Sequence, residues 1–245
     1  MPSEGDALTD LDVGGYVLAG GKSSRMGRDK ALLELAGKPL VQHAVTKLRR
    51  VCADVHILSE RQELAVYAPL VGDLHTGCGP LGGIESAFEH SSHEWNLFMP
   101  VDMPFLPSSF LSAWVVRFAY PGLLMGARVA LFTVCGRPQP LFCLLHRDAA
   151  SFVRGAIERG EYKVFPVLEL AGKQLAERLG LPLYRVFRNT PWGEEALLSV
   201  TCEGDCEPWR VPTEAQLAAK DLWFANLNTP EEFAEAERFV DALDT

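Results

Sequence analysis

Two hydrophobic patterns alternate along the first half of this chain. Short apolar runs bounded by glycine, proline or charged residues are typical of strands in a buried sheet. They predict strands at 15–19, 55–59 and 96–101. Elsewhere apolar residues recur every three to four positions, as on one face of a helix, and predict helices at 39–52, 81–89 and 107–119. A chain in which strands and helices alternate in this way favours a mostly parallel sheet covered by helices.

The second half of the chain continues the alternation less regularly. It predicts strands at 123–135 and 141–145, helices near 147–159 and 162–171, candidate strands at 183–187 and 197–201, a late strand at 224–228 and a closing amphipathic helix at 230–243. The periodicity is weakest from about 175 to 222. We therefore expect a single α/β domain, Rossmann-like, over residues 14–245, with 175–222 as an elaborated insertion and 1–13 as a loose tail.

Composition narrows the class of protein. The 245 residues carry 23 lysines and arginines against 32 aspartates and glutamates, and this net charge of −9 argues against a nucleic-acid partner. A hydrophobic fraction of 48% is enough for a proper core. The most apolar stretch, 95–116, contains three prolines and Asp102, so we expect no membrane partner. Six scattered cysteines, and a start without the features of a secretion signal, favour a cytoplasmic location.

A basic loop follows the first strand directly. Residues 20–29 begin with Gly20 and Gly21 and include Arg25, and Lys30 comes next. Glycines let the backbone approach a ligand closely, and the cations match the charge of a polyphosphate. The spacing is not that of the phosphate loop G-x-x-x-x-G-K-[ST], because the second and third glycines lie six residues apart and an arginine follows. Position and charge together predict a phosphate-binding site of another type.

This loop carries a resemblance to a known family. Leu-Ala-Gly-Gly-x-Ser-x-Arg-Met-Gly-x-Asp-Lys at 18–30 resembles the signature of the MobA-type nucleotidyltransferases, the molybdenum cofactor guanylyltransferases. Further motifs follow in the family's order: Leu-Leu-Glu-Leu with Gly-Lys-Pro-Leu at 32–40, Gly-Pro-Leu-Gly-Gly at 79–83, Pro-Val-Asp-Met-Pro at 100–104, and Asn-Leu-Asn-Thr-Pro-Glu-Glu at 226–232. The matches frame 14–170 and 222–243, so the resemblance covers most of the chain.

The resemblance implies a reaction and a set of site residues. The reaction is transfer of GMP from GTP to the terminal phosphate of molybdopterin, with Mg²⁺ as cofactor and release of pyrophosphate. Lys30 and Arg25 would neutralise the triphosphate, and Asp102 would bind Mg²⁺. Proteins that insert or deliver the molybdenum cofactor are implied partners beside these two small-molecule substrates. The implied nucleotide-binding residues are Leu18, Ala19, Gly20, Gly21, Lys30, Asp73 and Asp102, with Asn226 and Asn228 lining the active site.

Several of these residues also have simpler interpretations. Asp102 precedes a proline-containing loop and could cap a turn or a helix. Asn226 and Asn228 precede Thr-Pro-Glu-Glu, a pattern typical of helix capping. The chain also departs from the family near the end of the second strand, where Leu58-Ser59-Glu60 stands in place of a common asparagine.

Three other functions stay open at this point. The segment 77–82 fits G-x-G-x-x-G with Asp102 twenty residues beyond it, as in a dinucleotide-binding unit. A cytidylyltransferase of the same family, acting on molybdopterin or another phosphorylated acceptor, is a closer alternative. A nucleotide-binding homologue without activity is the third, because a fold does not determine a function.

Overall fold

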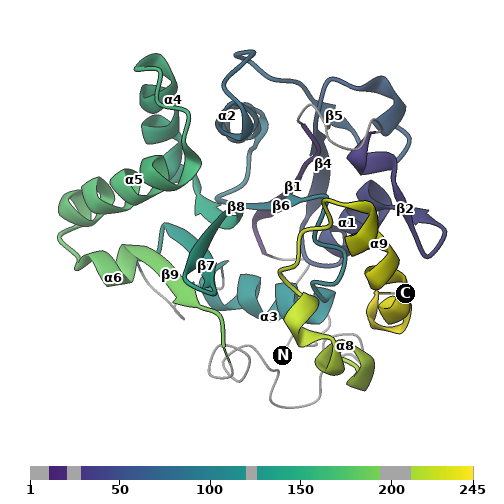
Figure 1. Cartoon of the computed structure of the whole chain (residues 1–245). Coiled ribbons are helices and arrows are strands. Elements are labelled where there is room, and N and C mark those ends of the chain that lie inside the picture. The colour runs from purple at the N-terminus through teal and green to yellow at the C-terminus, as the bar shows by residue number, and fades with distance from the viewer. Residues whose placement is uncertain (1–10, 21–28, 120–125, 194–210, 245) are drawn as a thin grey trace, which may run out of the picture.

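The fold is built on one central sheet, shown in a computed structural model that describes residues 11–20, 29–119, 126–193 and 211–244 (Figure 1). Seven strands follow the order β5-β4-β1-β6-β8-β7-β9. β8 alone runs antiparallel to the rest of the described sheet. The strands are β1 (Val13–Leu18), β4 (Asp54–Leu58), β5 (Leu70–Val71), β6 (Trp95–Pro100), β7 (Val129–Val134), β8 (Arg137–His146) and β9 (Phe187–Pro191), and β2 (Glu34–Leu35) and β3 (Lys38–Pro39) form a separate hairpin.

Helices cover both faces of the sheet (Figure 1). One face packs against α1 (Leu40–Leu48), α3 (Ser108–Ala119), α9 (Pro230–Ala236) and the 3₁₀ helix η6 (Glu237–Ala242), and α8 (Glu214–Ala218) lies against η6. The other face packs against α2 (Pro80–His90), α4 (Ala150–Glu158) and α5 (Val164–Leu179). The expected single α/β domain with a mostly parallel sheet is therefore confirmed. None of the described helices is long and apolar enough to cross a membrane.

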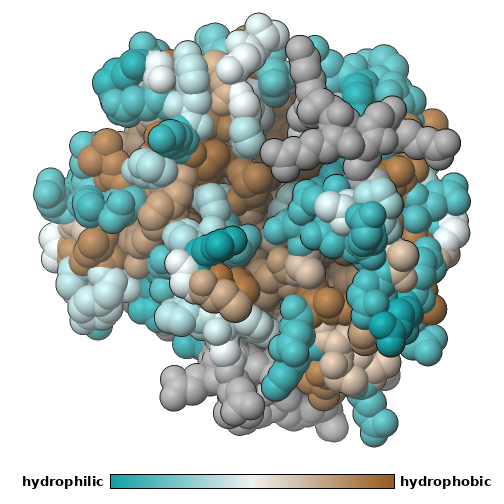
Figure 2. All heavy atoms as spheres, viewed as in Figure 1, coloured by the Kyte–Doolittle hydropathy of each residue, from teal (hydrophilic) through white to brown (hydrophobic). Residues whose placement is uncertain are grey.

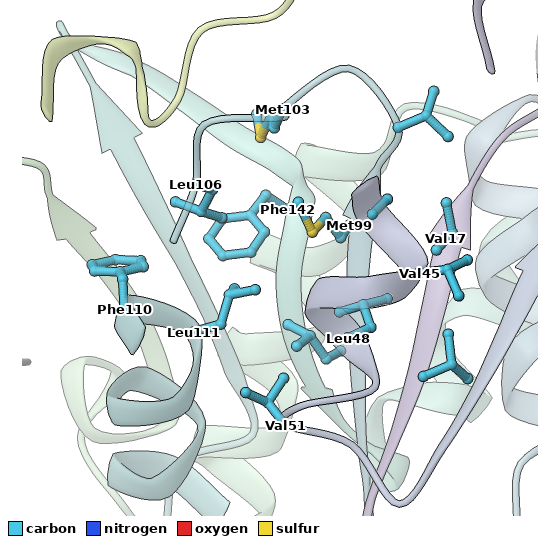
Figure 3. Packing of buried hydrophobic residues seen from close by; sticks show 14 of the residues in the cluster. Val17, Val45, Leu48, Val51, Met99, Met103, Leu106, Phe110, Leu111 and Phe142 are labelled. Atoms are coloured by element: carbon cyan, nitrogen blue, oxygen red, sulfur yellow. The ribbon is translucent and has the colours of Figure 1, made fainter. Parts of the chain in front are cut away.

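The two large hydrophobic clusters, one on each face of the sheet, explain why the strands consist of continuous apolar runs. Neighbouring side chains on a strand point to opposite faces of a sheet. Tyr16 and Val17 are both fully buried, Tyr16 against the α2 side and Val17 against the α1 side. Figure 3 shows Val17 close to Val45 and Leu48 of α1. In a strand that is covered on both faces, the side chains on both sides are apolar. The residues 15–19 therefore form an apolar run that predicts a strand clearly.

Two expected strands are wrong. Residues 183–187 form a helical turn, α6 (Leu183–Val186), and the strand β9 begins only at Phe187. Residues 224–228 form no strand, because Phe224 and Leu227 are buried against the aromatic core as part of a loop. Burial of a loop produces the same apolar pattern as a short strand. The candidate strand at 197–201 lies outside the described residues.

The remaining differences concern the ends of elements. The closing helix predicted at 230–243 is divided into α9 and η6, and within η6 Phe239 has a non-helical φ of −118°. β1 begins at Val13, and β5 was not predicted because a strand of two residues has no detectable period.

On the face that Figure 2 shows, polar side chains form most of the rim and apolar side chains are visible between them in the middle.

The sheet order determines which residues share an edge. β1, β4, β5 and β6 are parallel neighbours, so their carboxyl ends lie on one side of the molecule. The residues that follow these ends include Gly20, Ser59, Asp73 and Asp102. Open α/β sheets bind their ligands at this edge.

Candidate active site

Three side chains from distant parts of the chain meet at the carboxyl edge of the sheet. Lys30 Nζ lies 2.5 Å from Asp102 Oδ2 and 2.6 Å from Asn228 Oδ1. The side chains of Lys30 and Asp102 are 19% and 17% exposed, so the pair is reachable from solvent but largely shielded from it. One cation is thus held within hydrogen-bond distance of both a carboxylate and an amide oxygen.

Asn228 owes its position to a loop that docks on the end of β6. Leu227 N donates a hydrogen bond to the carbonyl of Asp102 at 3.0 Å. Asn228 Nδ2 donates to the carbonyl of Asn226 at 2.9 Å, which leaves Asn228 Oδ1 facing Lys30. Asn226 therefore lies beside the site and takes part through its backbone oxygen.

The capping interpretation of the same loop is also correct. Thr229 Oγ1 accepts a hydrogen bond from Glu232 N at 3.2 Å, and Glu232 Oε2 accepts one from Thr229 N at 2.9 Å. This reciprocal capping box starts α9. The same loop therefore both caps α9 and forms part of the site, since the cap fixes the position of Asn228.

Asp102 has one oxygen without a hydrogen-bond partner in the described part of the chain. Its Oδ2 accepts a hydrogen bond from Lys30 Nζ, whereas its Oδ1 is buried and accepts no hydrogen bond from any described residue. Leaving a buried carboxylate oxygen unpaired costs free energy unless a cation binds to it. The residues thus fit a hard cation such as Mg²⁺, which prefers oxygen ligands.

The residues expected on the nucleotide side lie along the same edge. Leu18 ends β1, and Ala19 follows it and leads into the exposed Gly20. Asp73 follows β5, and burial together with the nearby Glu60 raises the pKa of its carboxyl group. β5 and β6 are three strand spacings apart, roughly 14 Å, so Asp73 is not brought into contact with Asp102. Gly21 and Arg25 lie outside the described residues.

One residue of this edge was not singled out from the sequence. Arg61 Nη2 donates to the carbonyl of Ala19 at 2.6 Å, and the Arg61 guanidinium forms an ion pair with Asp29. Its Nε also donates to Ser59 Oγ at 3.3 Å. The only sequence signal was its place after the second strand, where the chain departs from the family; the contact with Ala19 depends on the order of the strands.

The dinucleotide-binding interpretation fails on topology. Gly79 caps the N-terminus of α2, but β5 ends at Val71, so the glycines do not follow a strand directly. β5 and β6, which precede and follow α2, are separated in the sheet by β4 and β1. The segment 77–82 is therefore not the turn of a unit in which two neighbouring parallel strands flank one helix.

Comparison with known proteins supports an assignment to a family. The family model for the MobA-like NTP transferase domain matches residues 15–179. A molybdenum cofactor guanylyltransferase from Yersinia pestis (strain Pestoides F) is 30% identical over 214 residues, which cover 84% of this chain and 98% of the relative. A guanylyltransferase of the same name from Yersinia pseudotuberculosis serotype O:3 has the same identity and coverage.

Solved structures support the same fold. The molybdopterin-guanine dinucleotide biosynthesis protein A from Archaeoglobus fulgidus has a TM-score of 0.63 at 21% identity, covering 94% of this chain and 100% of its own. A nucleotidyl transferase from Methanothermobacter has a TM-score of 0.59 at 13% identity, covering 94% of this chain and 98% of its own. Taken with the sequence matches, these findings show that the chain is a nucleotidyltransferase of the MobA-like NTP transferase family.

Proposed function

We propose that this protein transfers GMP from GTP to the terminal phosphate of molybdopterin and releases pyrophosphate. The observation that carries the proposal is the contact of Lys30 with Asp102 and Asn228 at the carboxyl edge of the sheet. The name shared by the relatives, molybdenum cofactor guanylyltransferase, supports GTP as the donor and molybdopterin as the acceptor.

The proposed reaction needs no general base. A phosphate monoester is largely deprotonated at neutral pH, because its second pKa lies near 6. One of its oxygens attacks the α-phosphorus of GTP, and the bond from that phosphorus to the oxygen bridging the β-phosphate breaks. The electron pair of that bond leaves with pyrophosphate. Catalysis then consists of positioning the two phosphates and neutralising their charge, and Lys30 supplies one cation for that task.

Mg²⁺ is the cofactor that we propose. Asp102 would hold it through the buried Oδ1, and the amide oxygens of Asn226 and Asn228 are candidates for further contacts. No group of three or more histidine, cysteine, aspartate or glutamate residues that could hold a metal is present among the described residues. A single protein carboxylate suits Mg²⁺, which commonly takes most of its other ligands from substrate phosphates and water. When bound, the ion would supply positive charge to the phosphate oxygens.

The other roles are proposed from the resemblance to the family and, for the described residues only, from their place at the edge of the sheet. Leu18, Ala19, Gly20 and Asp73 are proposed to contact the nucleotide, with Lys30, Gly21 and Arg25 on the phosphate side. We propose a cytoplasmic location, supported by the free thiols of the four described cysteines. Proteins that insert or deliver the molybdenum cofactor would receive the product.

The test is a transfer assay with matched nucleotides. The purified protein is incubated with molybdopterin, Mg²⁺ and either GTP, CTP or ATP, and pyrophosphate and the dinucleotide product are measured. We expect product with GTP and a loss of about 100-fold or more in Asp102→Asn, whereas Asp241→Asn, an exposed aspartate of η6, retains activity. Product with CTP alone would favour the cytidylyltransferase, and no product with any nucleotide would favour the inactive homologue.

A further inference from the structure

Arg61 joins three segments at the carboxyl edge of the sheet. It follows β4 and reaches the carbonyl of Ala19 at the end of β1, 2.6 Å from its Nη2. Its other terminal nitrogen, Nη1, pairs with the carboxylate of Asp29, and its Nε donates to Ser59 Oγ. Ala19 precedes residues 20–28 and Asp29 follows them, so one guanidinium links the backbone of Ala19 to the side chain of Asp29, ten positions later in the sequence.

Asp29 connects Arg61 to the backbone of Lys30. One oxygen of Asp29, Oδ2, faces Arg61, and the other, Oδ1, accepts a hydrogen bond from Ala31 N at 3.0 Å. Asp29 thereby caps the 3₁₀ helix η1 (Lys30–Leu32), whose first residue is Lys30. The Asp29 carboxylate thus restrains the backbone of Lys30, and Arg61 restrains that carboxylate.

The pair is protected enough to act as a restraint. The side chains of Arg61 and Asp29 are 30% and 20% exposed, and burial lowers the pKa of the Arg61 guanidinium. Such a pair is less screened by water and salt than a fully exposed one. The planar fork of arginine donates to a carbonyl and a carboxylate at the same time, which the single ammonium of lysine does less well.

We propose that Arg61 is a positioning residue for nucleotidyl transfer. It holds Asp29, and through Asp29 the position of Lys30 against Asp102, while it also orients the Ala19 carbonyl at the end of β1. The inference rests on the proposed function only in that Lys30 acts on the transferred nucleotide.

The first test separates positioning from binding. Arg61→Gln and Arg61→Lys are compared with Arg49→Gln and Arg49→Lys, because Arg49 Nη2 makes a matched hydrogen bond to the carbonyl of Tyr67 at 2.6 Å on the exposed surface. We expect Arg61→Gln to lower kcat about 100-fold and Arg61→Lys about 10-fold, since a shift of about 1 Å in a reacting group has effects of this size. The Kd for the nucleotide and Mg²⁺ should change far less, and the Arg49 variants should behave as the unaltered protein.

A double-mutant cycle tests whether Arg61 acts through Asp29. If it does, the losses in Arg61→Gln and Asp29→Asn do not multiply in the double variant, because the second substitution removes a restraint that is already lost. Multiplying losses, or a kcat per folded molecule that Arg61→Gln leaves unchanged, would overturn the proposal.

A readout without catalysis keeps this proposal separate from the proposed function. Hydrogen exchange is measured on the ligand-free variants over residues 29–33. We expect faster exchange there in Arg61→Gln than in Arg49→Gln, because the cap of η1 is loosened. Unchanged exchange in Arg61→Gln would overturn the positioning role even if GTP is the substrate. Faster exchange together with transfer from CTP would support Arg61 and contradict only the choice of GTP.

Discussion

At the scale of single residues, Lys30 is the group on which the phosphate side of the site depends. Its ammonium contacts oxygens of Asp102 and Asn228, which the proposed Mg²⁺ would also bind, and the phosphates of a bound nucleotide would attract the ammonium itself. We predict that Lys30→Met weakens binding of GTP with Mg²⁺ by about 10-fold or more, because a hydrogen bond to a charged group contributes about 1.5–3 kcal/mol. Isothermal titration calorimetry measures this effect directly.

Lys173 provides the control for this prediction. It pairs with Glu169 on the exposed side of α5, with Nζ 3.1 Å from Oε1, so its ammonium also has a carboxylate partner. Lys173→Met should leave the Kd for GTP unchanged. Equal affinities in the Lys30 and Lys173 variants would show that the charge of Lys30 does not reach the nucleotide.

At the scale of elements, the capping box of α9 links helix stability to the site. We predict that Thr229→Ala destabilises the fold by about 1 kcal/mol and lowers the rate of transfer, because the cap positions Asn228. Melting temperature and kcat are the two measurements. Thr213→Ala is a matched control, since Thr213 forms the same capping box with Gln216 at the start of α8, and among the described residues it makes no hydrogen bond to Lys30, Asp102 or Asn228.

The comparison between the two caps isolates the role of position. Both variants should lower the melting temperature by a similar amount, roughly 2–4 °C for a chain of this size. Only Thr229→Ala should lower kcat. If both variants lose activity equally, or neither does, the link between the cap and Asn228 is wrong.

At the scale of the whole molecule, Asp244, the last described residue, ties the C-terminal segment to the core. Asp244 accepts hydrogen bonds from Lys47 Nζ of α1 at 3.1 Å, from Ser108 N at 2.9 Å and from Gln216 Nε2 at 2.9 Å. Lys47 is 1% exposed. Removing one member of a buried pair costs about 3–5 kcal/mol, so we predict a loss of this size in the free energy of unfolding of Asp244→Asn, measured with urea at neutral pH. The exposed Asp241→Asn should cost little.

The pair of Asp244 and Lys47 also makes the free energy of unfolding depend on pH. Burial tends to raise the pKa of Asp244, but Lys47 and Ser108 outweigh it and lower the pKa below that of an ordinary aspartate. A carboxyl group with a lowered pKa stabilises the fold above its unfolded pKa, and this contribution is lost as pH falls through the folded pKa. We predict that the free energy of unfolding falls below about pH 4 by more in the unaltered protein than in Lys47→Met. Equal pH dependence in the two would contradict this account.

Much of the fold could be predicted because each pattern reflects local physics. β1, β4 and β6 are buried on both faces, and α1 and α3 each present an apolar stripe, so their residues alone predict them. The segments at 183–187 and 224–228 were wrong because a buried loop or helical turn carries the same apolar residues as a short strand. β9 was misplaced for the same reason.

The sequence by itself determined the alternation of strands and helices, the family, and the identity of Lys30, Asp102 and Asn228. These follow from periodicity and from motifs, which are properties of neighbouring positions along the chain. Only the tertiary structure decided that these three side chains meet, that Arg61 contacts Ala19 and Asp29, and that Asp244 reaches α1. Such contacts depend on the order β5-β4-β1-β6 and on where the C-terminal loop docks, and packing of the complete chain sets both.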